Sequence, residues 1–288
     1  MHAVAGLKES LPGVEIGWLT SVKMGALVVC APFIKRVHAM EVGGIFAAMR
    51  AARRVRSELA GQYDVVVDVQ GLFKSAAAAR LAGAPVLGYG GGDAREGAGF
   101  LYTWRVTPGE EAVHVVDKQA QLLSALADVK PSRRIFLAPP PGILDRVEER
   151  FPWAVRNTFA VVHRATRWPS KNLPLRLVED IVNGLEGEGM SVAVSAGDEA
   201  DAAELRKLRA GARGHLLAGL SLGELVWLYS RAGVYIGPDT GPTHLAAALG
   251  VPTVAIFGPT DPLRNAPYGS PTIVLRPAGA GCEPCWRR

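Results

Sequence analysis

Apolar runs typical of buried strands alternate along this chain with segments whose apolar residues recur at helical spacing. Before residue 141 this pattern predicts strands at 15–20, 64–69 and 86–89 and helices at 3–11, 44–59, 71–82 and 113–126. After residue 158 it predicts strands at 159–163, 191–195, 234–236, 253–257 and 272–275 and helices at 173–185, 200–209, 222–231 and 242–249. Such alternation is typical of parallel sheets that are covered by helices on both faces.

A run of turn-forming residues, Pro139-Pro140-Pro141-Gly142, separates the two alternating series. At 288 residues the chain is longer than one average domain and suits two. We therefore expect an N-terminal Rossmann-like domain at 1–141, a linker at 142–158 and a C-terminal domain at 159–288. The predicted fold class is α/β, with two doubly wound domains facing across a cleft and ligand at the carboxyl ends of the strands.

Composition adds a preference for acidic partners. Hydrophobic residues make up 49% of the chain and charged residues 20%, which supports sizeable cores and argues against disorder. The formal net charge of +5 favours a nucleotide, a phosphorylated lipid or an anionic membrane surface as partner. No apolar run is long enough to span a membrane, and no signal peptide is recognisable at Met1.

The three cysteines cannot all pair with one another, so a reducing cytoplasm is the expected compartment. Cys282 and Cys285 form a lone C-x-x-C close to the last residue. A zinc site would need two further ligands, which the sequence after it does not supply. We interpret this pair as structural or as a truncated motif.

Polar residues gather where the apolar run at 232–236 gives way to a predicted helix. This crossing carries Asp239, Thr240, Gly241 and, one turn further on, His244. Unpaired backbone N–H groups and the positive end of the helix dipole make a helix start a seat for phosphate, and Gly241 lets a ligand approach the backbone. The alternative is a helix capped by Asp239 or Thr240, with His244 packed beneath the sheet.

Two other predicted strand ends in the second half carry charged residues. Arg167 and Lys171 follow the strand at 159–163, and two cations there suit a pyrophosphate. Glu199 or Asp201, after the strand at 191–195, is a candidate to accept hydrogen bonds from a ribose. Acidic residues in the first turn of a helix are also ordinary partners of its dipole, which is the alternative here.

The first half offers a similar but weaker set. Gln70, Lys74 and Ser75 follow the strand at 64–69, and Arg95 lies in a glycine-rich loop where it can grip an anion. The alternative is a turn and a loop whose charges are simply solvated. The predicted helix at 44–59 is basic, and its arginines form either a docking face or a solvated face; they are Arg50, Arg53, Arg54 and Arg56.

Five motifs occur here in the order and spacing of one enzyme family. They are D-V-Q-G-L-F-K-S at 68–75, A-R-E at 94–96, R-W-P-S-K at 167–171, D-T-G-P-T-H at 239–244 and F-G-P-T-D-P at 257–262. On these motifs the whole chain resembles the bacterial ADP-heptose:lipopolysaccharide heptosyltransferases of glycosyltransferase family 9, and it looks most like heptosyltransferase I. The resemblance implies a GT-B fold and inverting transfer of L-glycero-D-manno-heptose from ADP-heptose to the Kdo of lipid A's inner core. The alternatives are another family 9 transferase, such as heptosyltransferase II, and a nucleotide-binding chain without turnover.

The resemblance also assigns residues to two groups. Those implied for the ADP donor are Asp239, Thr240, Gly241, Pro242, His244, Thr166, Arg167, Lys171, and Glu199 or Asp201. Within this group Thr240, Gly241 and His244 would meet the pyrophosphate and Lys171 would neutralise it. Those implied for the sugar and acceptor side are Gln70, Lys74, Ser75, Arg95, Arg53 and Arg56. No metal or other cofactor is expected.

Members of this family usually begin with a strand and a G-D-x-x-H-x-L-P loop, whose Asp is the presumed general base. The present sequence opens on a predicted helix, so the resemblance implies a base upstream of Met1 and a chain truncated at both ends. The implied partner is a phosphorylated Kdo-lipid A acceptor rather than a nucleic acid. The implied location is the cytoplasmic face of the inner membrane, with peripheral contact.

Overall fold

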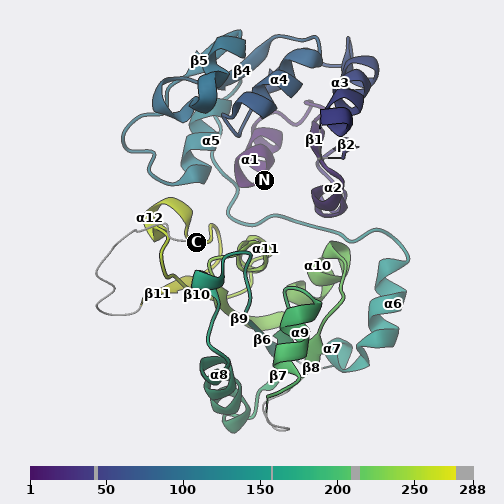
Figure 1. The fold of residues 1–288 in the computed structure, drawn as a ribbon, viewed down its shortest axis with the longest axis vertical. Helices are drawn as coiled ribbons and strands as arrows, with labels where there is room; N and C mark the ends of the chain where they lie inside the picture. The colour runs from purple at the N-terminus through teal and green to yellow at the C-terminus, as the bar shows by residue number, and fades with distance from the viewer. Residues whose placement is uncertain (42–44, 157, 209–214, 277–288) are drawn as a thin grey trace. The chain divides into compact units, whose positions relative to one another are not determined.

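The computed structural model describes residues 1–41, 45–156, 158–208 and 215–276 (Figure 1). The chain folds into two compact units. Unit 1 comprises residues 1–28 and 33–132, and unit 2 comprises residues 29–32 and 133–288. The Cys282–Cys285 motif lies outside the described residues.

Unit 1 contains short parallel strands, each followed by helical segments. Its elements are α1 (His2–Ser10), β1 (Gly17–Ser21), α2 (Val22–Val28), β2 (Arg36–Met40), α3 (Ile45–Leu59), β3 (Val66–Val67), α4 (Phe73–Leu81), β4 (Val86–Tyr89), the 3-10 segments η1 (Gly91–Asp93) and η2 (Arg95–Leu101), β5 (Trp104–Val106) and α5 (Val115–Leu123). Within the described part of this unit, β1 and β2 form one parallel pair, and β3, β4 and β5 form a parallel three-stranded sheet.

Small residues let α4 and η2 approach the three-stranded sheet of unit 1. Ala76 and Ala79 of α4 pack with Ala98 of η2 and with Val86 and Tyr102. A side chain at Gly88 would overlap the Tyr102 ring, since its Cβ would lie 2.4 Å from a ring carbon. The alanine-rich sequence of α4 is therefore explained by close packing rather than by helix propensity alone.

Unit 2 is built on one continuous parallel sheet. Its elements are α6 (Ile143–Arg150), α7 (Pro152–Arg156), β6 (Phe159–His163), η3 (Pro169–Lys171), α8 (Leu175–Gly187), β7 (Ser191–Ser195), α9 (Glu199–Leu205), β8 (His215–Leu217), α10 (Leu222–Ser230), β9 (Ala232–Pro238), α11 (Gly241–Ala248), β10 (Thr253–Ile256), α12 (Pro262–Asn265) and β11 (Thr272–Leu275). The six strands run in the order β11-β10-β9-β6-β7-β8. This is the doubly wound arrangement, in which the strand order reverses between β6 and β9.

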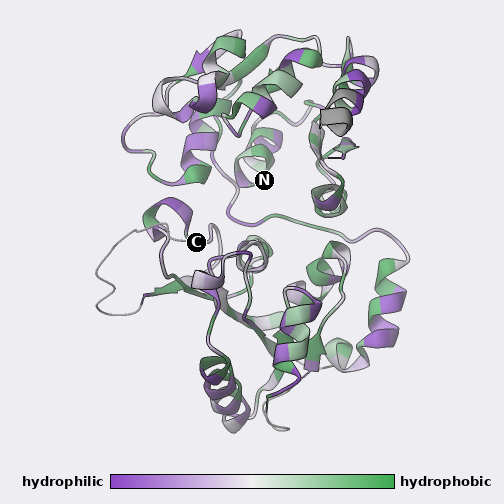
Figure 2. Cartoon of the chain, in the orientation of Figure 1, coloured by the Kyte–Doolittle hydropathy of each residue, from purple (hydrophilic) through white to green (hydrophobic). Residues whose placement is uncertain are grey.

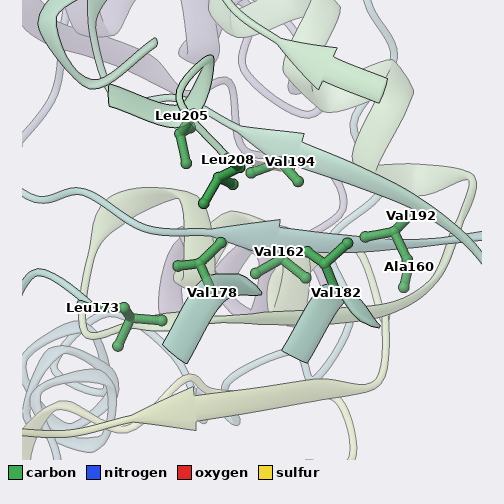
Figure 3. Packing of buried hydrophobic residues seen from close by; sticks show 9 residues of the cluster. All are labelled: Ala160, Val162, Leu173, Val178, Val182, Val192, Val194, Leu205 and Leu208. Carbon is green, nitrogen blue, oxygen red and sulfur yellow. The ribbon is translucent and has the colours of Figure 1, made fainter. Parts of the chain in front are cut away.

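The core of unit 2 joins β6 and β7 to the helix between them. Val178 and Val182 of α8 lie against Val162 and Val194 of the two strands (Figure 3). All five residues of β6 are buried, as expected for a central strand covered on both faces. The sheet is therefore a firm platform for the loops at its carboxyl edge.

Residues 142–158, which we predicted to be a linker, instead contain α6 and α7 of unit 2. Hydrophobic and hydrophilic residues alternate along α6 (Figure 2), and the side chain of Val147 is completely buried. A Cβ atom built at Gly223 would lie 2.5 Å from Cδ1 of Ile143. The Ile143 side chain therefore packs against α10 at this glycine. The preceding Pro139–Gly142 run suggested a linker, whereas Ile143–Arg150 after it form an amphipathic helix.

Several short elements were not predicted, among them α2, β2, β5 and β8. The sequence of β2, Arg36-Val37-His38-Ala39-Met40, has no apolar run, and β5 and β8 have only three residues each. Among the described helices, none is both long enough and apolar enough to cross a membrane.

Candidate active site

The strand order of unit 2 brings two polar loops together. β6 and β9 are neighbours in the sheet, and the loops that follow them carry Lys171 and Asp239 respectively. The point where a doubly wound sheet reverses its order leaves a crevice outside the carboxyl ends of the two strands. The residues predicted to bind a pyrophosphate therefore lie at the edge where this fold binds its ligands.

Asp239 is the centre of this site. Its side chain is 8% exposed, and Lys171 Nζ donates to its Oδ2 atom over 2.6 Å. The Thr260 hydroxyl donates to the same oxygen over 2.6 Å, and His244 Nε2 lies 3.3 Å from Oδ1. The motif at 257–262, predicted to lie beside Asp239, thus reaches it through Thr260.

The environment keeps Asp239 ionised. Burial by itself raises the pKa of this carboxyl group, but hydrogen bonds from His244, Lys171 and Thr260 outweigh burial and hold the pKa well below its usual range. The Lys171 side chain is only 12% exposed, and its ammonium also lies over the Trp168 ring, with Nζ 4.6 Å from the ring centroid. Lys171 and Asp239 therefore form a fixed, largely buried ion pair within the site.

The start of α11 is open to a ligand. Thr240 is the N-cap residue, yet its side chain makes no capping hydrogen bond. Gly241 is exposed, and a Cβ built there would meet nothing within 4 Å. His244 is 41% exposed and faces Asp239. The alternative of a capped helix with His244 packed beneath the sheet is therefore wrong.

A side-chain hydrogen bond from the first turn of α11 fixes the turn that leads into this helix. The hydroxyl of the buried Thr243 donates to the carbonyl of Pro238 over 2.6 Å. Pro242 occupies the first turn of the helix, where its missing N–H leaves no helical hydrogen bond unmade. The N–H groups of this turn therefore have a defined direction before any ligand arrives.

Arg164 closes the loop that carries Lys171. Its Nε donates to the carbonyl of Leu173 over 3.1 Å, and its guanidinium pairs with Asp201. Inside the loop the Asn172 side chain accepts from the backbone N–H of Thr166, and the Thr166 hydroxyl donates to the carbonyl of Trp168. Thr166 therefore shapes the loop.

Asp201 serves the same loop rather than facing solvent. Its carboxylate is 4% exposed, pairs with Arg164 and accepts from the backbone N–H of Gly197. The interpretation of Asp201 as a ribose ligand is corrected, because both of its oxygens are already engaged. Glu199, whose side chain is 74% exposed and pairs with Arg206, has a carboxylate that a ligand can reach.

In unit 1 a buried carboxylate organises the D-V-Q-G-L-F-K-S motif. Asp68 accepts from the Ser75 hydroxyl over 2.7 Å and from the Tyr102 hydroxyl over 2.8 Å. Burial raises the pKa of Tyr102, and the hydrogen bond to Asp68 raises it further. The prediction that Ser75 faces a ligand is corrected, because its hydroxyl binds Asp68 and the start of α4.

The exposed residues of this motif lie beside the A-R-E loop. Gln70 and Lys74 are exposed, and the backbone N–H of Arg95 donates to the carbonyl of Gly71 over 2.8 Å. Gly71 has a positive φ of 69°, and a Cβ there would lie 2.3 Å from the carbonyl oxygen of Asp93. The two motifs therefore form one local assembly, and only glycine fits at its centre.

The basic helix α3 packs Val55 and Leu59 into the core and leaves its arginines outside. Arg54 pairs with Glu58 four residues later. Arg53 and Arg56 are exposed and three residues apart, so they lie on the same side of the helix.

The sequence analysis gave no role to Arg164, Asn172 or Trp168, although Trp168 belongs to the motif at 167–171. A signal was present, because all three belong to the polar segment that follows β6. Among the described residues, no group of three or more His, Cys, Asp or Glu side chains is arranged to hold a metal ion.

Comparisons with known proteins agree on one family. Residues 52–288 match the family model described as "Glycosyltransferase family 9 (heptosyltransferase)". A curated relative from Pseudomonas aeruginosa, named lipopolysaccharide heptosyltransferase 1, is 27% identical over 300 aligned residues, which cover 100% of this chain and 82% of the relative.

Solved structures agree on the fold. The structure described as "E. coli heptosyltransferase WaaC with ADP" matches with a TM-score of 0.81 and 24% identity, over 96% of this chain and 88% of that one. The same enzyme "with ADP-2-deoxy-2-fluoro heptose" matches with a TM-score of 0.79 and 23% identity, over 96% and 88% of the two chains. These neighbours are heptosyltransferases of the GT-B type, so the predicted α/β, GT-B class is confirmed.

Proposed function

Because this chain belongs to glycosyltransferase family 9, we propose that it transfers L-glycero-D-manno-heptose from ADP-heptose to the Kdo of the lipopolysaccharide inner core, with inversion. The family makes it a transferase, and the proposal adds the donor, the acceptor and the stereochemistry. The resemblance to relatives named lipopolysaccharide heptosyltransferase 1 supports addition of the first heptose.

One observation carries the proposal, namely the Lys171–Asp239 pair beside the open start of α11. A lysine ammonium has three N–H donors, and Asp239 engages Lys171 through its carboxylate and through its backbone carbonyl. Departure of ADP leaves negative charge on the β-phosphate. Lys171, the Thr240 hydroxyl and the N–H groups of Gly241 and its neighbours are positioned to stabilise that charge.

The remaining donor residues have supporting roles in this proposal. Arg167 is exposed on the loop that holds Lys171, where it adds a second cation for the pyrophosphate. Glu199 accepts hydrogen bonds from the ribose hydroxyls, while Pro242 and Thr166 shape the two loops. The solved neighbour described with ADP supports a nucleotide diphosphate as the ligand of such a site.

The acceptor is assigned to unit 1. Gln70, Lys74 and Arg95 are the exposed polar residues of its two joined motifs. Arg53 and Arg56 add an exposed basic face on α3. Cations suit an acceptor that carries phosphate and carboxylate groups, because charge-assisted hydrogen bonds to these groups are the strong ones.

Incubating the purified chain with ADP-heptose and Kdo-lipid A tests the proposal. We expect ADP release together with an acceptor that gains the mass of one heptose. ADP-glucose serves as the control donor, and an acceptor that already carries one heptose tests whether the first addition is the reaction. Tight ADP binding without any product would overturn the proposal in favour of a nucleotide-binding chain without turnover.

A further inference from the structure

Thr260 joins a third loop to the ion pair of Lys171 and Asp239. It lies between β10 and α12 and is 1% exposed. Its hydroxyl donates to Asp239 Oδ2 over 2.6 Å, and the same oxygen accepts from Lys171 Nζ over 2.6 Å. A hydrogen bond to a carboxylate is stronger than one between neutral groups. Thr260 is therefore linked to Lys171 through one shared oxygen atom.

The strand order places the loop of Asp239 between the two loops that donate to it. β9 lies between β10 and β6 in the sheet of unit 2 (Figure 1), and the loops after these strands carry Thr260 and Lys171. The backbone N–H of Asp239 also donates to the carbonyl of Ile256 in β10 over 3.3 Å. The carboxylate of Asp239 is therefore the point at which three neighbouring strand ends are tied together.

The loop that carries Thr260 is fixed on both sides of this residue. Before it, the backbone N–H of Phe257 donates to the carbonyl of Leu275 over 2.8 Å. After it, the Asp261 side chain caps α12 by accepting from the backbone N–H of Leu263 over 2.9 Å. Threonine is also stiff at χ1, because its Cβ is branched. The hydroxyl of Thr260 therefore has a defined position before any ligand arrives.

Asp239 requires such a second donor to keep one orientation. The torsion that turns a carboxylate is broad, so a single donor does not fix its plane. His244 Nε2 lies 3.3 Å from Oδ1, which is long for a strong hydrogen bond. Without the Thr260 hydroxyl, the carboxylate would be free to turn, and the ammonium that it holds would move with it. Thr260 is too deeply buried to contact a ligand, so any effect that it has on ligand binding must pass through Asp239.

We propose that Thr260 is a positioning residue of the donor site, which acts through Asp239 to hold the Lys171 ammonium beside the start of α11. The assignment rests on the proposed function in that ADP is the ligand of Lys171. One consequence distinguishes it from a general role in stability. The effect of Thr260 on ADP binding must disappear once Lys171 is removed.

A double-mutant cycle on ADP affinity, measured by calorimetry with the full chain, tests this consequence. Thr260→Val removes the hydroxyl but keeps the shape, and we expect it to weaken ADP binding at least about fivefold. Thr260→Ser, which retains a hydroxyl, should bind ADP within about twofold of the wild type. In a Lys171→Ala background, Thr260→Val should change the affinity by less than about twofold, because residues that act as one unit give losses that do not add. The same fold loss in both backgrounds, or no loss in either, contradicts the proposal.

Thr253→Val is the matched control. Thr253 begins β10, is 2% exposed and donates its hydroxyl to the carbonyl of Val251 over 2.8 Å. This variant also deletes a buried hydroxyl, but at the opposite end of the same strand. We expect it to lower Tm and to leave ADP affinity unchanged. A loss of ADP affinity equal to that of Thr260→Val would identify general destabilisation as the cause and overturn the positioning role.

Urea unfolding without ADP separates this proposal from the proposed function. For Thr260→Val, Lys171→Ala and the double variant, we expect the loss of unfolding free energy in the double variant to differ from the sum of the two single losses, since both residues share Asp239. Such coupling in a chain that binds no ADP would leave the linkage of Thr260 to Lys171 standing and overturn the proposed function. Additive losses in a chain that binds ADP would overturn the positioning role and leave the proposed function standing.

Discussion

The two units use parallel strands in different ways. In unit 2 six strands form an unbroken sheet, and the central strand β6 is buried along its whole length. In the described part of unit 1, five strands are divided between a pair and a three-stranded sheet, and every residue of β1 is only half-buried. Among the described strands of unit 1, β4 is buried along its whole length, but it belongs to a sheet of three strands, whereas β6 lies in the middle of six. The loops that follow β6 and β9 therefore stand on the more extended core.

The candidate residues follow the same division. Lys171 and Asp239 in unit 2 form an ion pair that is 12% and 8% exposed. Lys74, Arg95, Arg53 and Arg56 in unit 1 are exposed cations. A site that must stabilise developing charge gains from fixed and partly dehydrated groups, whereas a site for a large phosphorylated acceptor can use exposed and adaptable ones. Substituting Lys171 or Asp239 in unit 2 should therefore affect both the stability of the fold and ligand binding. Substituting one of the exposed cations in unit 1 should affect ligand binding alone.

The largest effect should come from Asp239→Ala. This change leaves the Lys171 ammonium almost buried without its carboxylate, and removing one partner of a buried pair typically costs about 3–5 kcal/mol of unfolding free energy. Urea unfolding measures the loss. The matched variant Arg95→Ala in unit 1 should change the unfolding free energy by less than about 0.5 kcal/mol. Equal losses in the two variants would remove the distinction between the units.

A smaller effect is expected from Lys171→Ala on ADP binding. A charge-assisted hydrogen bond to phosphate contributes about 1.5–3 kcal/mol. ADP affinity measured by calorimetry should therefore fall at least about tenfold. Arg167→Ala is the control on the same loop and should weaken binding less, because Arg167 is exposed. A change of less than about twofold for Lys171→Ala would transfer the main cationic role to Arg167.

The exposed arginines of α3 should produce a weaker effect that depends on salt. We expect Arg53→Ala and Arg56→Ala each to raise the KM for the lipid-linked acceptor about two- to fivefold at low ionic strength, since exposed ion pairs contribute up to about 1 kcal/mol. The effect should fade at high salt, and ADP affinity should stay constant. Arg54→Ala serves as the control because Arg54 already pairs with Glu58. An effect that persists at high salt would argue against a solvated docking face.

Local patterns predicted the second unit well. The predicted bounds of β6, β7 and β11 are those of the structure, because each is an apolar run between turn residues. The same method missed β2, which contains no apolar run, and it mistook an amphipathic helix after a proline run for a linker.

The site was predicted as a set of strand ends, without its internal pairings. Lys171 and Asp239 are separated by 68 residues, and they meet because β6 and β9 are neighbours in the sheet. The pairing of Arg164 with Asp201 spans 37 residues and explains why the ribose interpretation of Asp201 was wrong. Local sequence patterns identify which residues end a strand, whereas the order of strands decides which of those ends meet.

The smallest effect should appear in the pH dependence of the Lys171–Asp239 pair. The folded-state pKa of Asp239 lies well below the reference value of 3.8, because the hydrogen bonds that it accepts outweigh its burial. A carboxyl group with a lowered folded pKa stabilises the fold fully above its unfolded pKa, and it loses that contribution only as the pH falls through the folded pKa. The difference in unfolding free energy between the wild type and Asp239→Asn should therefore stay constant from pH 7 to about pH 5, and it should shrink only in stronger acid. Taking the difference between the two proteins cancels the titration of the groups that do not contact Asp239, and carrying out both measurements in a His244→Gln background removes the histidine that does contact it. A difference that already declines between pH 7 and pH 5 would show that Asp239 is not held ionised by its partners, and the fixed ion pair would then not distinguish unit 2 from unit 1.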